Sequence, residues 1–323
     1  MRHFPKPNVV ISECLEFTAC RYNGQIVHDS FVKKLGKFVN YTPICPEVSI
    51  GLGTPRFPVR LVSVDNETRL IQPATGRDVT DEMNKFSKAW LERLKEIDGF
   101  ILKFRSPSCG IKDVRIYAKA EKSPAVDKGP GLFAGHVNRN FAGLAIEDEG
   151  RLMNLKIREH FLTKLFTLAT FRETKKSSQQ ISTLARFHAE NKFLLMAYGQ
   201  NELKTLGNIV ANHKQEPVPE VFESYEKCLK TSMTTPPKRS ANINVLMHIL
   251  GYFSSKLSKN EKEFFLETMM FYREGRIPYT SAVALLRGWT VRFQDEYLTP
   301  QTLFEPYPKE LLDWTDGGRV IEL

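Results

Sequence analysis

The chain has 323 residues, of which 41% are hydrophobic, and it carries a formal net charge of +9 at neutral pH. This length predicts two domains, and the apolar fraction excludes a disordered chain. Because no run reaches 18 apolar residues, we expect no transmembrane helix. Ser12, Glu13 and Cys14 interrupt the first apolar stretch, so we expect no signal peptide and a cytoplasmic protein. The five cysteines are then expected to be reduced thiols and not a disulfide framework.

The charge is unevenly distributed along the chain. Residues 1–150 carry +4, residues 151–239 carry +7 without a single aspartate, and residues 240–323 carry −2. A basic excess of this kind is what a phosphate-binding surface requires, although a solvated helical surface accounts for it equally well.

The first half of the chain alternates strand and helix patterns. Asp65 and Asn66 separate two β-branched runs, which predicts a hairpin, and Thr80 is expected to be the N-cap of a helix. This alternation predicts an α/β domain with a mainly parallel sheet. Strands are expected at residues 9–11, 41–44, 60–64, 69–71 and 100–104, and helices at residues 30–39 and 80–97.

The second half has long helical patterns punctuated by glycine and proline, which predicts an all-α helical C-terminal domain. The polar stretch at residues 172–180 marks the expected boundary, giving domains at residues 1–172 and 173–323. Helices are expected at residues 152–170, 182–198, 221–230, 242–257, 259–273 and 281–297.

Three cysteines share a local context. Cys14, Cys45 and Cys109 each lie just beyond the carboxyl end of a predicted strand. In a parallel sheet those ends share one edge, where ligands bind. A thiolate-rich site favours zinc, copper(I) or an iron–sulfur cluster, but the paired cysteines typical of structural zinc are missing. Buried cysteines without a ligand are the alternative, and we assign Cys228 to that class.

Four segments together resemble the bacterial thiouracil desulfidase family: SECLEFTACRYNG (12–24), CPEVSIGLGTPR (45–56), TGRDVT (75–80) and RSPSCG (105–110). The helical half resembles the domain fused to that family in enzymes that remove sulfur from 4-thiouridine in tRNA. Its matching segments are RFHAENKFLLMAY (186–198), NVLMHILGYF (244–253), YREGRIPY (272–279) and YLTPQTLFEPYPKEL (297–311).

The resemblance implies a [4Fe–4S] cluster bound by three cysteines, Cys14, Cys45 and Cys109. It also implies that Glu47 and Ser106 are catalytic, in a desulfidase that hydrolyses the carbon–sulfur bond without electron transfer. On their local sequence, Glu47 is equally typical of a surface carboxylate or helix cap, and Ser106 of a turn residue. The role of Cys20 stays open.

The resemblance implies tRNA containing 4-thiouridine as the partner, held in part by the basic middle of the chain. We expect no membrane partner. The alternatives are a desulfidase of free thiouracil or thionucleosides, a non-enzymatic iron–sulfur RNA-binding regulator, and a zinc-bound structural module. The candidate RNA contacts are Arg186, Lys192, Lys238 and Arg239, with Lys175 and Lys176 in the expected linker.

Overall fold

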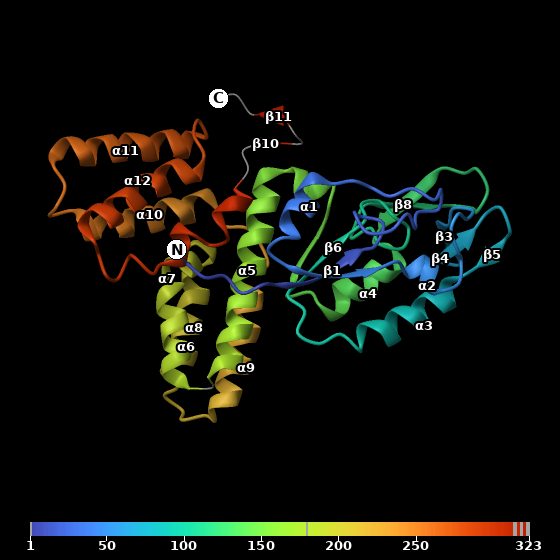
Figure 1. Ribbon diagram of the computed structural model, residues 1–323, viewed down its shortest axis with the longest axis horizontal. Helices are drawn as coiled ribbons and strands as arrows, with labels where there is room; N and C mark the ends of the chain where they lie inside the picture. Colours follow the sequence, from blue (N-terminus) through green and yellow to red (C-terminus); the bar gives the residue numbers. More distant parts are fainter. Residues whose placement is uncertain (1, 179, 313–314, 317–318, 321–323) are drawn as a thin grey trace. The chain divides into compact units, whose positions relative to one another are not determined.

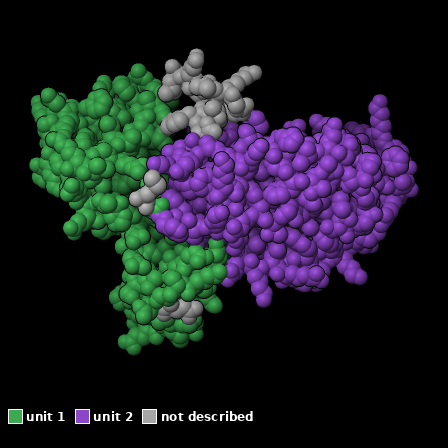
Figure 2. All heavy atoms as spheres, in the orientation of Figure 1, with its two compact units in different colours: residues 1–2, 170–306 green, residues 3–169, 307–323 purple. Residues whose placement is uncertain are grey.

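The computed structural model describes residues 2–178, 180–312, 315–316 and 319–320. The chain folds into two compact units (Figure 2). The cysteine unit, purple in Figure 2, contains His3–Ala169 and the segment that begins at Tyr307. The helical unit, green in Figure 2, contains Thr170–Pro306 and Arg2.

A four-stranded parallel sheet forms the centre of the cysteine unit. Its strand order is β2 (Asn40–Ile44), β1 (Asn8–Ser12), β6 (Gly99–Leu102) and β9 (Ala145–Asp148). Every neighbouring pair in this sheet is parallel. The predicted α/β domain with a mainly parallel sheet is therefore confirmed.

Helices cover both faces of the parallel sheet. On one face α1 (Ser30–Leu35) and the first turns of α5 (Leu155–Ser177) form a buried cluster with the strands. Helices α3 (Thr80–Leu91) and α4 (Leu132–Asn140) pack against each other, and Phe100 of β6 contacts Phe141, which follows α4. Side chains alternate between the faces of a strand, so β1 and β6 contribute to both layers and read as continuous apolar runs.

A second sheet, which we call the mixed sheet, lies in the same unit. Its order is β5 (Arg77–Asp78), β4 (Glu67–Gln72), β3 (Arg60–Val64), β7 (Val114–Tyr117) and β8 (Ala125–Gly129). Only the pair β3 and β7 is parallel.

The predicted hairpin is confirmed within the mixed sheet. β3 and β4 are antiparallel, and the two residues between them, Asp65 and Asn66, have φ angles of 49° and 64°. A two-residue turn of this hand matches the twist of the flanking strands, and aspartate and asparagine tolerate it well.

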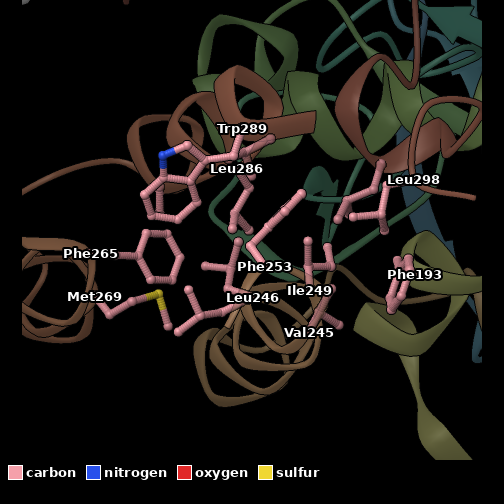
Figure 3. Packing of buried hydrophobic residues seen from close by; sticks show 14 of the residues in the cluster. Phe193, Val245, Leu246, Ile249, Phe253, Phe265, Met269, Leu286, Trp289 and Leu298 are labelled. Atoms are coloured by element: carbon pink, nitrogen blue, oxygen red, sulfur yellow. The ribbon is translucent and has the colours of Figure 1, made fainter. Parts of the chain in front are cut away.

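The helical unit has its own core, shown in Figure 3. Phe253 and Phe265 both pack against Trp289, with ring centroids 6.1 and 5.4 Å from it. Its helices (Figure 1) are the remainder of α5, α6 (Ile181–Glu190), α7 (Lys192–Tyr198), α8 (Gln200–Ala211), α9 (Val218–Ser232), α10 (Arg239–Phe253), α11 (Lys259–Glu274) and α12 (Tyr279–Phe293). The predicted helical C-terminal region is confirmed.

None of the described helices is both long enough and apolar enough to span a membrane. The short elements are α2 (Pro46–Ser49), β10 (Thr315–Asp316), β11 (Arg319–Val320) and three 3₁₀ turns, η1 (Arg151–Met153), η2 (Thr302–Phe304) and η3 (Lys309–Leu311).

The structure corrects several predicted boundaries. The helix expected at residues 182–198 is two helices, because the buried Asn191 interrupts it: its amide donates to the Phe187 carbonyl at 2.8 Å and its Oδ1 accepts from the Thr302 hydroxyl at 2.9 Å. The helix expected at 80–97 starts at Thr80 itself, so Thr80 is not the N-cap.

The boundary between the expected domains also differs in the structure, and several elements were not predicted. α5 continues to Ser177, so Lys175 and Lys176 lie on a helix and not in a linker. Helices α4 and α8 and strands β7, β8 and β9 were not predicted. These elements are short and contain few apolar residues. Their formation therefore depends on packing with distant parts of the chain.

Candidate iron–sulfur site

The carboxyl ends of three parallel strands present three cysteines at one edge of the sheet. Cys14 lies two residues after β1, Cys45 directly follows β2, and Cys109 lies in the loop after β6. Cys14 and Cys109 are buried, and Cys45 is half-buried. Because the strands are adjacent and parallel, the fold brings together cysteines that are up to 95 positions apart in sequence.

Cys20 joins this group. Its thiol lies within hydrogen-bonding reach of the thiols of Cys14 and Cys45, and the bond with Cys14 raises the pKa of Cys20 to about 12. The Cys45 pKa is also raised, first by its hydrogen bond with Cys20 and then by burial. The Cys45 thiol can additionally donate to the Cys20 carbonyl, with the sulfur 3.9 Å from the oxygen.

Cys109 is supported by two serine hydroxyls. Burial raises the pKa of its thiol, whereas hydrogen bonds from Ser12 and Ser106 act in the opposite direction. Ser106 Oγ also accepts from the backbone N–H groups of Ser108 and Cys109, at 3.2 and 3.1 Å. The predicted catalytic residue Ser106 therefore holds the loop and the Cys109 sulfur together.

The first turn of α4 fixes the loop that carries Cys109. The backbone N–H of Leu132 donates to the Pro107 carbonyl at 3.2 Å, and that of Ala134 donates to the Ser108 carbonyl at 3.0 Å. Gly131 packs so closely that a β-carbon placed there would lie 2.5 Å from the Ser108 carbonyl carbon. Glycine is therefore required by the close approach of the two backbones.

The other end of the same loop is anchored at the sheet. The backbone N–H of Lys103 donates to Ser12 Oγ at 2.9 Å, and that of Phe104 donates to Glu149 Oε2 at 2.7 Å. Lys103 Nζ forms an ion pair with the other oxygen of Glu149. The loop is thus held at both ends, which fixes the position of the Cys109 sulfur relative to β1.

Glu47 lies in a buried polar triad beside the cysteines. Arg56 donates from Nε and Nη2 to Glu47 Oε2 at 2.9 and 2.7 Å, and Ser108 Oγ donates to Glu47 Oε1 at 2.8 Å. A third arginine nitrogen, Nη1, donates to the Cys20 carbonyl at 2.9 Å. Both carboxylate oxygens of Glu47 therefore accept hydrogen bonds, which fix its orientation. The bonds from the arginine are charge-assisted.

Sequence reasoning identified Glu47 but not its partners. Neither Arg56 nor Ser108 was predicted to be a site residue. The spacing of nine residues between Glu47 and Arg56 matches no helix or strand period, and Ser108 meets Glu47 only across 61 positions of sequence. No local pattern could have found this triad.

The donor set fits a polynuclear iron–sulfur centre. Sulfur ligands select soft metals and clusters, and this pocket offers the sulfurs of Cys14, Cys20, Cys45 and Cys109. Over the part of the chain that the structure describes, no three histidine, cysteine or acidic side chains are close enough to hold one metal ion.

The predicted RNA contacts lie on three helices of the helical unit. Arg186 on α6 is exposed, as are Lys238 and Arg239 at the start of α10. Arg239 Nη1 donates to the Arg273 carbonyl at 3.0 Å. Lys192, the first residue of α7, is half-buried, and its ammonium lies 5.6 Å from the centre of the Tyr297 ring. The three exposed cations are therefore accessible to solvent and to a negatively charged partner.

Comparisons with known proteins match the two halves of the chain separately. The family model "2-thiouracil desulfurase" matches residues 9–149, and a second one, "Protein of unknown function (DUF1722)", matches residues 192–308. All residues of the cysteine site lie within the first match.

Three relatives extend these matches. The uncharacterized protein YbbK of Bacillus subtilis is 36% identical over 32% of this chain and 72% of its own length. The uncharacterized protein YbgA of Escherichia coli is 24% identical over 49% of this chain and 94% of its own length. The solved structure of the "[4Fe-4S]-dependent thiouracil desulfidase TudS" is 31% identical, covers 46% of this chain and 93% of its own, and gives a TM-score of 0.37.

Proposed function

Because the chain belongs to the 2-thiouracil desulfurase family through residues 9–149, we propose that it is a desulfidase that converts 4-thiouridine in tRNA to uridine. The observation that carries the proposal is the convergence of cysteine sulfurs beside the triad of Glu47, Arg56 and Ser108. Soft sulfur ligands can bind a metal centre. The oriented carboxylate beside them can accept and donate protons.

Cys14, Cys45 and Cys109 are the proposed ligands of a [4Fe–4S] cluster. When bound, the cluster supplies an iron without a protein ligand, a Lewis acid that polarises the carbon–sulfur bond of the substrate. Cys20 is buried beside these ligands and supports Cys14 and Cys45 through its thiol.

The proposed reaction is a hydrolysis without a net oxidation or reduction. Water adds at C4 of the pyrimidine, and one of its protons passes through Glu47 to the sulfur. The carbon–sulfur bond then breaks, hydrosulfide leaves, and the second proton of the water is released as the new carbonyl forms. Glu47 Oε1 takes the proton of the attacking water, and the Ser108 hydroxyl bonded to the same oxygen keeps it aimed. Arg56 holds Glu47 through the other oxygen, so the carboxylate keeps its position when the proton moves.

We propose tRNA as the partner because the helical unit carries residues 170–239 of the basic middle of the chain, which have a net charge of +4. Arg186, Lys192, Lys238 and Arg239 remain the proposed contacts, and Arg186 and Lys238 are exposed. A desulfidase of free thiouracil is the second candidate, favoured by the description of the matching family model.

The test is an assay of the anaerobically purified full-length protein with thiolated tRNA, 4-thiouridine and 2-thiouracil. We expect sulfide release and loss of the near-ultraviolet thiouridine absorbance, with the highest kcat/KM on tRNA. Glu47→Gln should retain the iron and lose about 10²- to 10⁴-fold in kcat. Protein with a full cluster that releases sulfide from none of the three substrates contradicts the proposal, and a preference for free 2-thiouracil selects the second candidate.

A further inference from the structure

A large basic groove lies on the mixed sheet, next to the loop that carries Cys109. Its volume is about 970 Å³. Small-molecule pockets typically measure about 300–1,000 Å³, so the groove has room for more than one nucleotide. Its floor and walls come from β3, β7 and β8 and from the loops that flank them.

The lining of the groove is strongly cationic. Its charged side chains comprise five cations and two carboxylates. Within the described residues, none of these cations forms an ion pair with a carboxylate. Cations without ion-pair partners around one hollow attract anions, because a concave surface concentrates their field. The cations are Arg60, Arg105, Arg115, Lys122 and Lys128, and the carboxylates are Asp113 and Glu121.

Two of the arginines are held in place by aromatic rings. The Arg60 guanidinium lies 4.0 Å from the centre of the Tyr117 ring, and its Nη1 donates to the Glu121 carbonyl at 2.8 Å. The Arg105 guanidinium lies 4.7 Å from the centre of the Phe104 ring. Stacked guanidinium groups lose less entropy on binding and keep free N–H donors for phosphate oxygens.

The groove and the cysteine site share the same backbone segments. Arg56 binds Glu47, and the chain enters the groove two residues later, at Pro58. Pro107 lines the groove, whereas the next two residues, Ser108 and Cys109, belong to the cysteine site. A nucleotide whose base enters the cysteine site therefore has its ribose and phosphates directed along a surface that these segments form.

We propose that this groove binds the sugar–phosphate backbone of the RNA strand on either side of the thiolated base. The identification of the strand as RNA rests on the proposed function, whereas the prediction of a polyphosphate site rests on the groove alone. Grooves that bind single strands combine cations along the backbone with aromatic side chains, and both are present here. The cysteine unit thereby contributes its own RNA contacts, in addition to those of the helical unit.

The experiment compares two triple variants of the full-length protein. The first, Arg115→Ala/Lys122→Ala/Lys128→Ala, removes three exposed groove cations without ion-pair partners. The matched control, Lys33→Ala/Lys37→Ala/Lys85→Ala, removes the same charge from exposed positions that do not line the groove. The probes are fluorescently labelled tRNA, measured by anisotropy over a range of salt concentrations, and 4-thiouridine and its 5′-monophosphate, measured by turnover.

We expect the groove variant to bind tRNA at least about tenfold more weakly, with a smaller salt dependence. Each lost phosphate contact lowers the slope of log Kd against log salt by about 0.7 to 0.9, so the loss of three contacts lowers it by about 2 to 3. Turnover of free 4-thiouridine should stay within about twofold of the parent protein, and the control variant should change neither quantity.

Two results would overturn the inference. The first is an unchanged tRNA affinity and salt slope in the groove variant. The second is an equal loss with tRNA and with the 5′-monophosphate, which would identify a site for a single phosphate and not for a strand. A protein that binds tRNA through the groove but desulfurises nothing would refute the proposed function while leaving the polyphosphate site intact.

Discussion

At the residue scale, three buried cysteines and the half-buried Cys45 lie together but differ in their support. Cys109 is fixed by two hydroxyls and a tethered loop, whereas Cys14 and Cys45 meet through the thiol of Cys20. A ligand and a supporting residue should therefore respond differently when they are replaced.

Single replacement of Cys14, Cys45 or Cys109 by alanine should abolish cluster retention. Each change removes one of only three proposed ligands. Iron and acid-labile sulfide content of anaerobically purified protein measure the effect. Cys20→Ala should give an intermediate iron content, and Cys228→Ala, on α9 outside the site, should match the parent protein. A full iron content in Cys45→Ala protein would show that the three-ligand assignment is wrong.

Asp148, at the end of β9, predicts a specific pH dependence of stability. Its side chain is completely buried, and burial raises its pKa to about 6 from 3.8. Oδ1 accepts from the Arg151 backbone N–H at 2.8 Å, whereas Oδ2 has no hydrogen-bond partner within the described residues. The folded protein therefore holds the proton more tightly than the unfolded chain does.

The sign of the effect follows from proton binding. Between about pH 4 and pH 6 the folded state binds more protons, so this group makes stability fall as the pH rises. At about 1.4 kcal/mol per pKa unit, the loss is at most about 3 kcal/mol at pH 7. In denaturant titrations Asp148→Asn should remove this slope, whereas Asp127→Asn, at an exposed position on β8, should keep it. Parallel pH profiles for parent and Asp148→Asn protein would contradict the shifted pKa.

At the scale of elements, strand ends were predictable and loop contacts were not. β1 and β6 contain short apolar runs, and β2 contains Tyr41, Thr42 and Ile44, which favour strands. These local patterns located the cysteines at the carboxyl ends of the strands. The geometry of the Cys109 loop depends instead on α4, which begins 23 residues after Cys109. α4 has only four buried residues in nine, so its pattern was too weak to predict it.

Gly131→Ala should damage the cysteine site more than the fold. A β-carbon at this position would lie 2.6 Å from the Ser108 carbonyl oxygen, so the loop that carries Cys109 must move. We expect a loss of most of the iron and a destabilisation of about 1–3 kcal/mol, the usual cost of overpacking. Iron analysis and denaturant unfolding measure the two effects.

The control for this change is Gly135→Ala in the same helix. Its nearest neighbour would be a terminal nitrogen of Arg139 at 3.5 Å, which is an ordinary contact. Because alanine is favoured over glycine inside a helix, this variant should be at least as stable as the parent protein and keep its iron. Full iron in Gly131→Ala protein would mean that the loop accommodates the extra carbon elsewhere.

At the scale of the whole molecule, the cysteine unit is discontinuous in sequence. The chain leaves it at Ala169, forms the helical unit, and contributes to it again from Tyr307. Tyr307 and Leu311 are buried in the cluster that also contains Val9, Cys14 and Phe161. From local patterns, residues 173–323 were all expected in one helical domain, because no local pattern shows with which core a short apolar segment packs.

A chain that stops near residue 172 would therefore lack part of the core beneath its cysteines. The sharper test is Leu311→Ala in the full-length protein, because Leu311 is only 2% exposed. Removing a buried leucine side chain typically costs about 2–5 kcal/mol. Hydrogen exchange resolved by peptide should show faster opening of β1 and β6, while the protection of α10 and α12 in the helical unit stays unchanged.

The neighbouring residue provides the matched control for this last prediction. Leu312 is 45% exposed, so Leu312→Ala removes the same atoms from a position that contributes little to the core. Its exchange pattern should match that of the parent protein. Faster exchange in α10 and α12 of the Leu311→Ala protein, without a change in β1 and β6, would assign the segment after Pro306 to the other core. A selective effect on the cysteine unit would instead mean that the stability of this unit depends on residues about 200 positions beyond Cys109, the last of the proposed ligands.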